Sequence, residues 1–142
     1  GSTGSIGVTA LKIAEEFSLN IDVLTAGKNI KKLNEQINIF KPNIVVVSNK
    51  EDIHKVNHNK IYHGDDGIIR AIEESSSSVV LNALVGFLGV LPTIKSIELN
   101  KTVALANKES LVVAGNLIDM SKIKIIDSEH FALWYMLNNR KV

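Results

Sequence analysis

A glycine-rich turn opens the chain and has the composition of a phosphate-binding loop. The turn reads Gly1-Ser2-Thr3-Gly4-Ser5-Ile6-Gly7 and heads a segment of helical periodicity, after which a buried strand is expected. Glycines let the backbone approach a pyrophosphate, and the free N–H groups at a helix amino end stabilise its charge. The GxxGxxG spacing is a variant of the dinucleotide fingerprint, so cofactor binding and a plain connecting turn are equally open on this motif alone.

A second polar segment, Ala26-Gly27-Lys28-Asn29, stands where the next apolar run ends. Dinucleotide-binding folds contact the adenosine ribose at this position. An acidic residue there accepts hydrogen bonds from the ribose hydroxyls of NAD, whereas a cation suits the extra phosphate of NADP. Lys28, with no carboxylate beside it, favours NADPH. The alternative is that Asn29 caps the following helix while Lys28 is solvated.

A third segment, Leu105-Ala106-Asn107-Lys108-Glu109-Ser110, leads from a strand into a helix. Its three adjacent polar residues Asn107, Lys108 and Glu109 can face the carboxyl edge of a sheet, where ligands bind in open α/β folds. An ordinary charged helix start is the alternative.

The fourth segment, Asp127-Ser128-Glu129-His130, again follows an apolar run directly. Two carboxylates separated by one residue can reach a single hard cation, and oxygen ligands suit magnesium or manganese. The alternative is helix capping by Asp127 or Ser128 with Glu129 in the first turn. His130 is not assigned to a metal.

Alternating strand and helix patterns predict the framework that positions these segments. Short runs rich in β-branched residues alternate with segments of helical period, which indicates an α/β fold with a mainly parallel sheet. We expect strands over Ile21–Ala26, Ile44–Val47, Lys60–Tyr62, Val79–Asn82, Thr102–Leu105 and Lys124–Ile126. We expect helices over Ser5–Phe17, Ile30–Phe40, Asp66–Glu74, Leu91–Leu99, Glu109–Ile118 and Glu129–Leu137.

Composition narrows the class of protein further. The 142 residues suit one domain over 1–142, and 16 lysines and arginines nearly balance 15 acidic residues, so a nucleic-acid partner is not indicated. The absence of cysteine excludes disulfides and thiolate metal sites and favours a reducing compartment. No apolar run approaches the roughly 20 residues of a membrane span, so no membrane role is expected.

The segments GSTGSIG, AGKN, NALVGFLGVLPT, LANKESLV and DSEH, in this order, resemble the 1-deoxy-D-xylulose-5-phosphate reductoisomerase family along the whole chain. The resemblance implies a Rossmann-like, doubly wound NADPH-binding domain. It also implies the conversion of 1-deoxy-D-xylulose 5-phosphate, a phosphorylated sugar, to 2-C-methyl-D-erythritol 4-phosphate in non-mevalonate isoprenoid biosynthesis. The cofactor contacts that it implies are Thr3, Gly4, Ser5, Ile6, Gly27, Lys28, Asn29, Asn107 and Glu109.

The same resemblance assigns the catalytic and metal-binding roles. Lys108 is implied as a catalytic and substrate-binding residue, and Ser128 and Glu129 as further substrate contacts. Asp127 and Glu129 are implied as two of three protein ligands to Mg²⁺ or Mn²⁺. The family further implies a homodimer, with a cytoplasmic bacterial location expected and a plastid-type organelle left open.

The chain also departs from the family pattern. A strand that precedes GSTGSIG in the family is absent, which predicts a gap in the sheet, and the chain stops soon after DSEH. We therefore expect a fragment that is inactive alone. The segment Gly86-Phe87-Leu88-Gly89 carries larger residues than the family's alanines. The alternatives are another NADPH-dependent oxidoreductase and a stand-alone dinucleotide-binding module.

Overall fold

The computed structural model describes residues 1–114, 119–126 and 136, and it has the expected α/β class. The α-helices are α1 (Ser5–Glu16), α2 (Ile30–Phe40), α3 (Gly64–Glu74), α4 (Val90–Glu98) and α5 (Lys108–Ala114). The strands are β1 (Val23–Ala26), β2 (Ile44–Val47), β3 (Ile61–His63), β4 (Val79–Asn82), β5 (Thr102–Leu105) and β6 (Ile123–Ile125). Three short 3₁₀ helices are η1 (Lys50–Lys55), η2 (Gly86–Gly89) and η4 (Met120–Lys122).

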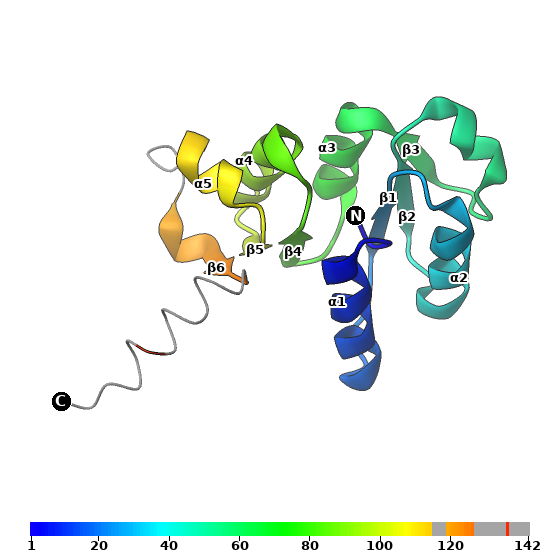
Figure 1. The fold of residues 1–142 in the computed structure, drawn as a ribbon, viewed down its shortest axis with the longest axis horizontal. Coiled ribbons are helices and arrows are strands. Elements are labelled where there is room, and N and C mark those ends of the chain that lie inside the picture. Colours follow the sequence, from blue (N-terminus) through cyan, green and yellow to red (C-terminus); the bar gives the residue numbers. More distant parts are fainter. Residues whose placement is uncertain (115–118, 127–135, 137–142) are drawn as a thin grey trace. The chain divides into compact units, whose positions relative to one another are not determined.

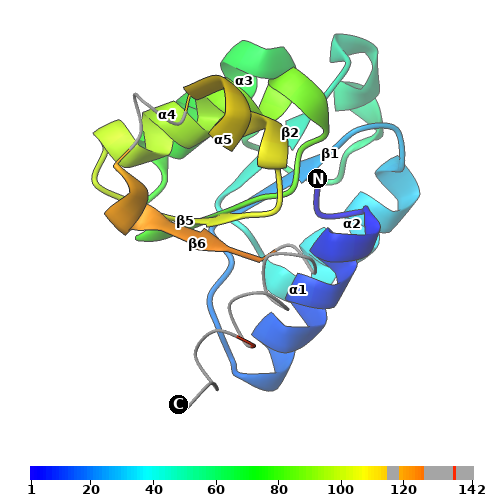
Figure 2. The same cartoon turned by 60° about the vertical axis from the view of Figure 1, so that its left-hand side comes forward.

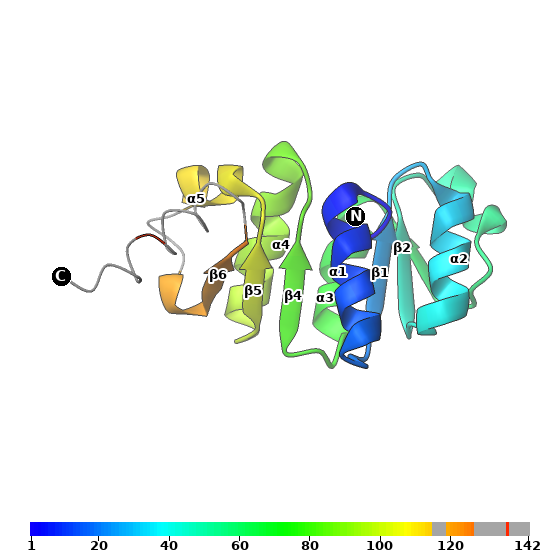
Figure 3. The same cartoon turned by 60° about the horizontal axis from the view of Figure 1, so that its bottom comes forward.

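The strands form two parallel sheets of three strands each, in the orders β1-β2-β3 and β4-β5-β6. Figure 3 shows β1 beside β2, and β5 between β4 and β6. Val23 pairs with Ile44 in the first sheet, and Val79 pairs with Thr102 in the second. Among the described strands, none of one sheet pairs with one of the other. All pairs are parallel, so the loops after the strands of each sheet meet at one edge.

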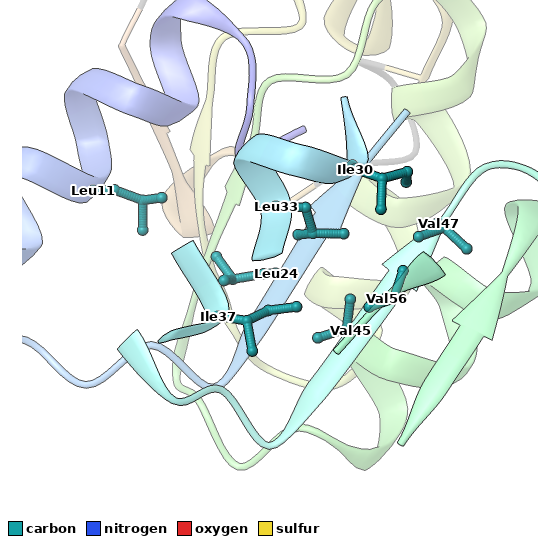
Figure 4. Close-up of a cluster of buried hydrophobic side chains, with 9 residues drawn as sticks. Leu11, Leu24, Ile30, Leu33, Ile37, Val45, Val47 and Val56 are labelled. Atoms are coloured by element: carbon teal, nitrogen blue, oxygen red, sulfur yellow. The ribbon is translucent and has the colours of Figure 1, made fainter. Parts of the chain in front are cut away.

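The chain divides into two compact units, Gly1–Ser77 and Ser78–Val142. The single domain expected over 1–142 stays a prediction. In the first unit, α1 and α2 cover one face of the sheet, where Leu24 and Val45 pack against Leu11 of α1 and Leu33 of α2 (Figures 1 and 4). Both faces of β2 are buried, because Ile44 and Val46 pack on the other side against Ala71 of α3.

Local sequence explains the bounds of α2. Asn29 caps its amino end by accepting a hydrogen bond from the Lys32 N–H. Ile30, Leu33 and Ile37 form its buried stripe. Lys41 ends the helix in the left-handed conformation, with φ of 48°, and Pro42 cannot continue it.

The second unit has a smaller apolar core. Val103, Leu105 and Ile123 are buried, and residues of α4 and α5 such as Ile94 and Leu111 pack against them. Figure 2 shows α4 and α5 beside β5 and β6. Much of the rest of its interior is polar, and the buried polar residues include Asn82, Thr93, Ser96, Asn107 and Ser110.

Most predicted bounds agree with the structure. Three strands and α2 have the expected bounds, and the other expected strands and helices within the described residues differ by one to two residues at one or both ends, except α5. The 3₁₀ helices were not predicted. The expected Glu109–Ile118 helix begins at Lys108, and its described part ends at Ala114. The expected helix Glu129–Leu137 lies outside the described residues, apart from Met136. None of the described helices is long and apolar enough to cross a membrane.

Candidate functional site

The glycine-rich turn lies at the head of α1 and leaves the amino end of this helix open. Gly4 is the N-cap residue, no side chain caps the helix, and no acidic residue lies in its first turn. Thr3 is half-buried, whereas Gly4, Ser5 and Ile6 are exposed. The first-turn N–H groups and the positive end of the helix dipole therefore form a site that suits an anion.

The turn is held tightly against the sheet and the helix. The Ser2 N–H donates to Thr25 O of β1 at 2.6 Å, and the Gly4 N–H donates to Gly1 O at 3.2 Å. A Cβ on Gly7 would lie 2.5 Å from Gly1 O and 2.6 Å from Ser2 O, so only glycine allows the turn to fold this closely over the helix. Sequence reasoning assigned no role to Ser2, although it is the residue that joins the turn to β1.

The end of β1 places the second predicted segment at the same edge of the sheet. The turn bonds to Thr25, two residues before Gly27, so the structure brings the two segments together within the first unit. Lys28 is exposed, and no ion pair involves it among the described residues. Asn29 uses its side-chain oxygen to cap α2, so the capping function considered for it is confirmed.

Asn107, predicted to contact the cofactor, has a buried side chain whose hydrogen bonds are all made within the protein. It is 2% exposed. Its amide nitrogen donates to Leu84 O at 2.6 Å and to Gly86 O at 2.8 Å. Its oxygen accepts from the N–H and the hydroxyl of Ser110 at 2.9 and 2.5 Å. The side chain therefore fixes the loop between β4 and α4 and the start of α5.

A second buried asparagine supports the same loop from the neighbouring strand. The Asn82 amide donates to Gly89 O at 2.7 Å and to the Thr93 hydroxyl at 2.8 Å. Thr93, in turn, lies 3.5 Å from the Ser110 hydroxyl. Buried polar residues thus join β4, η2, α4 and α5, and no buried side-chain nitrogen or oxygen in the described part of the chain lacks a partner.

The remaining predicted residues follow β5 and β6. Lys108 is the first residue of α5, and Glu109 lies half-buried in the same first turn. The Ile126 N–H donates to Leu105 O at 3.0 Å, so the chain just before Asp127 runs beside the end of β5. Asp127, Ser128 and Glu129 themselves lie outside the described residues. Their predicted roles stay predictions.

The group with the most perturbed pKa among the described residues belongs to a surface cluster and not to this edge. Glu74 of α3 lies 2.7 Å from Lys60 Nζ and 2.8 Å from Arg70 Nε, and accepts a hydrogen bond of 2.8 Å from the Tyr62 hydroxyl. The hydrogen bonds from Lys60, Arg70 and Tyr62 lower the pKa of the Glu74 carboxyl to about 2. This cluster joins β3 to α3, so its role is structural.

Comparison with known proteins gives the family of the chain. The family model for 1-deoxy-D-xylulose 5-phosphate reductoisomerase matches residues 1–115. The protein of that name from Campylobacter lari is 52% identical over 141 residues, which are 99% of this chain and 39% of that protein. The one from Helicobacter pylori (strain HPAG1) is 51% identical over 142 residues, with the same coverage of 99% and 39%.

Solved structures of this family have a similar fold. A crystal structure of DOX-P reductoisomerase in complex with NADPH, fosmidomycin and magnesium matches with a TM-score of 0.84 and 30% identity, covering 95% of this chain and 37% of that one. The Rossmann-like fold expected from the sequence is thereby confirmed. The chain spans 39% of the length of the two curated relatives. Since the family model covers residues 1–115 of the 142, the chain belongs to the 1-deoxy-D-xylulose 5-phosphate reductoisomerase family.

Proposed function

We propose that the natural protein containing residues 1–142 is an NADPH- and divalent-metal-dependent reductoisomerase. It converts 1-deoxy-D-xylulose 5-phosphate to 2-C-methyl-D-erythritol 4-phosphate in non-mevalonate isoprenoid biosynthesis. The observation that carries the proposal is the uncapped amino end of α1, with the glycine-rich turn bonded to β1. Family membership gives this anion site its specific ligand.

NADPH is the proposed cofactor, and the described residues fit it. The first-turn N–H groups of α1 face the pyrophosphate, with Thr3, Gly4, Ser5 and Ile6 around it. Lys28 pairs with the phosphate on the adenosine ribose, because it is an exposed cation at the end of β1 without a described ion pair. The remaining proposed cofactor contacts are Gly27, Asn29, Asn107 and Glu109. Because the Asn107 side chain is hydrogen-bonded within the protein, Asn107 contacts the cofactor through its main chain.

The second unit supplies the proposed substrate and metal contacts. Lys108 stabilises negative charge on the substrate's oxygens, and Ser128 and Glu129 bind the substrate. Asp127 and Glu129 hold Mg²⁺ or Mn²⁺, since paired carboxylates are the ligands that hard cations prefer. When bound, the metal acts as a Lewis acid on the substrate oxygens and NADPH supplies the hydride. A relative crystallised with NADPH, fosmidomycin and magnesium supports both assignments.

The proposal extends to assembly and location. The protein acts as a cytoplasmic homodimer, as the family resemblance implies, and its named relatives above are bacterial.

The test is NADPH oxidation by the purified natural protein that contains residues 1–142. We expect absorbance at 340 nm to fall only when 1-deoxy-D-xylulose 5-phosphate and Mg²⁺ or Mn²⁺ are both present, with one 2-C-methyl-D-erythritol 4-phosphate formed per NADPH. Tight NADPH binding without turnover of this substrate would favour another oxidoreductase. Binding with no redox activity on any sugar phosphate or semialdehyde would favour a stand-alone dinucleotide-binding module.

A further inference from the structure

We propose that Gln36 of α2 is a positioning residue that holds the glycine-rich turn in the conformation that binds the cofactor's pyrophosphate. The inference rests on the proposed NADPH site and adds a residue outside the glycine-rich motif.

Two hydrogen bonds join the Gln36 amide to Ser2. The Ser2 hydroxyl donates to Gln36 Oε1 at 2.6 Å, and Gln36 Nε2 donates to Ser2 O at 2.9 Å. The same hydroxyl lies 3.0 Å from Thr25 O, which also accepts from the Ser2 N–H at 2.6 Å. Every polar group of Ser2 is thus engaged by β1 or α2.

Gln36 is buried, although its amide is polar. Gln36 is 6% exposed and lies on the buried face of α2 beside Leu33 and Ile37. An apolar side chain would need no hydrogen-bond partner at this buried position, whereas a buried amide is unfavourable unless its polar atoms are bonded. Among the described residues, the hydrogen-bond partners of the Gln36 amide are both atoms of Ser2.

The hydrogen bonds between Gln36 and Ser2 determine which polar groups of the turn remain free to bind a ligand. With Ser2 fixed on one side and Gly7 packed beneath the turn, the chain at Thr3 and Gly4 is held between two anchored points. The N–H groups that face an anion are then positioned before the cofactor arrives, so binding does not have to order them. The Ser2 hydroxyl is directed at Gln36 and not at the ligand.

The experiment replaces Gln36 by Met in the natural full-length protein and measures dissociation constants for NADPH and NADH. Met keeps the length of the side chain but removes both hydrogen bonds. We expect both constants to rise by about ten-fold, because the pyrophosphate is common to the two cofactors and the lost contacts act through the turn. The KM for NADPH should rise with kcat at saturating NADPH nearly unchanged. Backbone amides of Thr3 and Gly4 should exchange hydrogen faster in the free protein.

Asn34→Ala is the matched control on the same helix. The Asn34 side chain also makes two bonds to the main chain, to Lys55 O and from the Asn57 N–H, both at 2.9 Å, but these hold the end of η1. We expect this variant to lower Tm without changing either dissociation constant. Ser2→Ala removes the hydroxyl bond from the other side, and in a double-mutant cycle with Gln36→Met its effect should be much less than multiplicative.

The outcomes separate the inference from the proposed function. Unchanged NADPH affinity and unchanged exchange at Thr3 and Gly4 in Gln36→Met would overturn the positioning role, even if Tm fell. If Gln36→Met does not fold, Ser2→Ala decides by the same two readouts. A wild-type protein that fails to bind NADPH would refute the proposed function instead, whereas the exchange measurement would still decide whether Gln36 orders the turn.

Discussion

Asp22 accepts a hydrogen bond of 2.6 Å from the Ser75 hydroxyl, which joins the residue before β1 to the loop that follows α3. The same carboxyl accepts from the Asn43 amide at 2.6 Å and from the Ser76 N–H at 2.8 Å. Asp22 is 5% exposed. One buried carboxylate thus holds three segments of the first unit together at the edge where β1 begins.

This arrangement predicts an acid-sensitive contribution to stability. Burial alone raises the pKa of the Asp22 carboxyl, but the hydrogen bonds from Ser75, Asn43 and Ser76 outweigh burial and hold the pKa below its ordinary 3.8. A depressed pKa stabilises the fold fully above the unfolded-state pKa, and the contribution is lost as the pH falls through the folded-state pKa. We expect Asp22→Asn to cost about 1–3 kcal/mol at pH 7 and less as the pH falls through the lowered pKa of the folded state.

Urea unfolding of both proteins between pH 2.5 and 7 measures this difference. Glu16→Gln is the control, because Glu16 is exposed near the end of α1. A difference between Asp22→Asn and the wild type that did not change with pH would show that the carboxylate's charge is not what stabilises the loop.

A methyl group at Gly7 should displace the glycine-rich turn. The added Cβ would lie 2.6 Å from Ser2 Cα, a main-chain atom that cannot move aside without shifting the turn. We expect Gly7→Ala to cost about 1–3 kcal/mol in the free energy of unfolding. Gly4→Ala is the stability control, since its Cβ would lie 3.5 Å from Gly1 O and its φ of −78° suits alanine. Equal stabilities of the two variants would contradict the close packing at Gly7.

The buried Asn107 should affect stability through the loop that it holds. Asn107→Ala leaves the Leu84 and Gly86 carbonyls and the Ser110 N–H without their partner, at a cost of about 1–3 kcal/mol. Asn107→Asp should cost more, because a carboxylate would face two carbonyl oxygens. Thermal unfolding tests the order. Wild-type stability with weakened NADPH binding would instead indicate a side-chain contact with the cofactor.

Lys28 should determine the preference of the protein for NADPH over NADH. We expect Lys28→Asp to raise the dissociation constant for NADPH roughly ten- to hundred-fold, with a much smaller change for NADH, because only NADPH carries a phosphate on the ribose. Titration of the natural protein with each cofactor gives both constants. Lys31→Asp, an exposed change in the first turn of α2, controls for net charge. Equal losses for both cofactors in Lys28→Asp would refute the assignment.

Glu129→Gln tests the proposed metal site. The amide keeps the size of the side chain but removes the negative charge on which hard cations depend. We expect activity to fall by several orders of magnitude while NADPH binding is retained. Steady-state rates over a range of Mg²⁺ and Mn²⁺ concentrations, with Glu98→Gln as an exposed control, measure the effect. Normal turnover without added metal would indicate that Glu129 does not bind a metal and instead belongs to the first turn of a capped helix.

Periodicity and strand composition were enough to predict the framework of this chain. Runs such as Ile44–Val47 are apolar on both faces, and α2 has a cap, an apolar stripe and a stop signal, so each is specified by local residues. The short helix η1 was missed, because 3₁₀ turns lack a long apolar period.

The sequence predicted where the candidate site residues lie in the fold more completely than it predicted their hydrogen-bond partners. Lys28 and the glycine-rich turn were recognised from their place after a strand or before a helix. The hydrogen bonds of Gln36 and Asn107 join residues far apart in the sequence, and no local pattern specifies such partners. A glutamine on the buried face of α2 was the available signal for Gln36, because a polar residue there requires a bonded partner.

The polar interior of the second unit limits which amino acids its buried positions can accept. Each of its buried polar residues Asn82, Thr93, Ser96, Asn107 and Ser110 has a hydrogen-bond partner. Valine, isoleucine and leucine can often replace one another in the core around Leu33 and Val45, since apolar contacts are not directional. Directional bonds allow no such exchange. In a saturation mutagenesis of the natural gene under selection for its product, the five polar positions should accept fewer amino acids than the apolar core of the first unit.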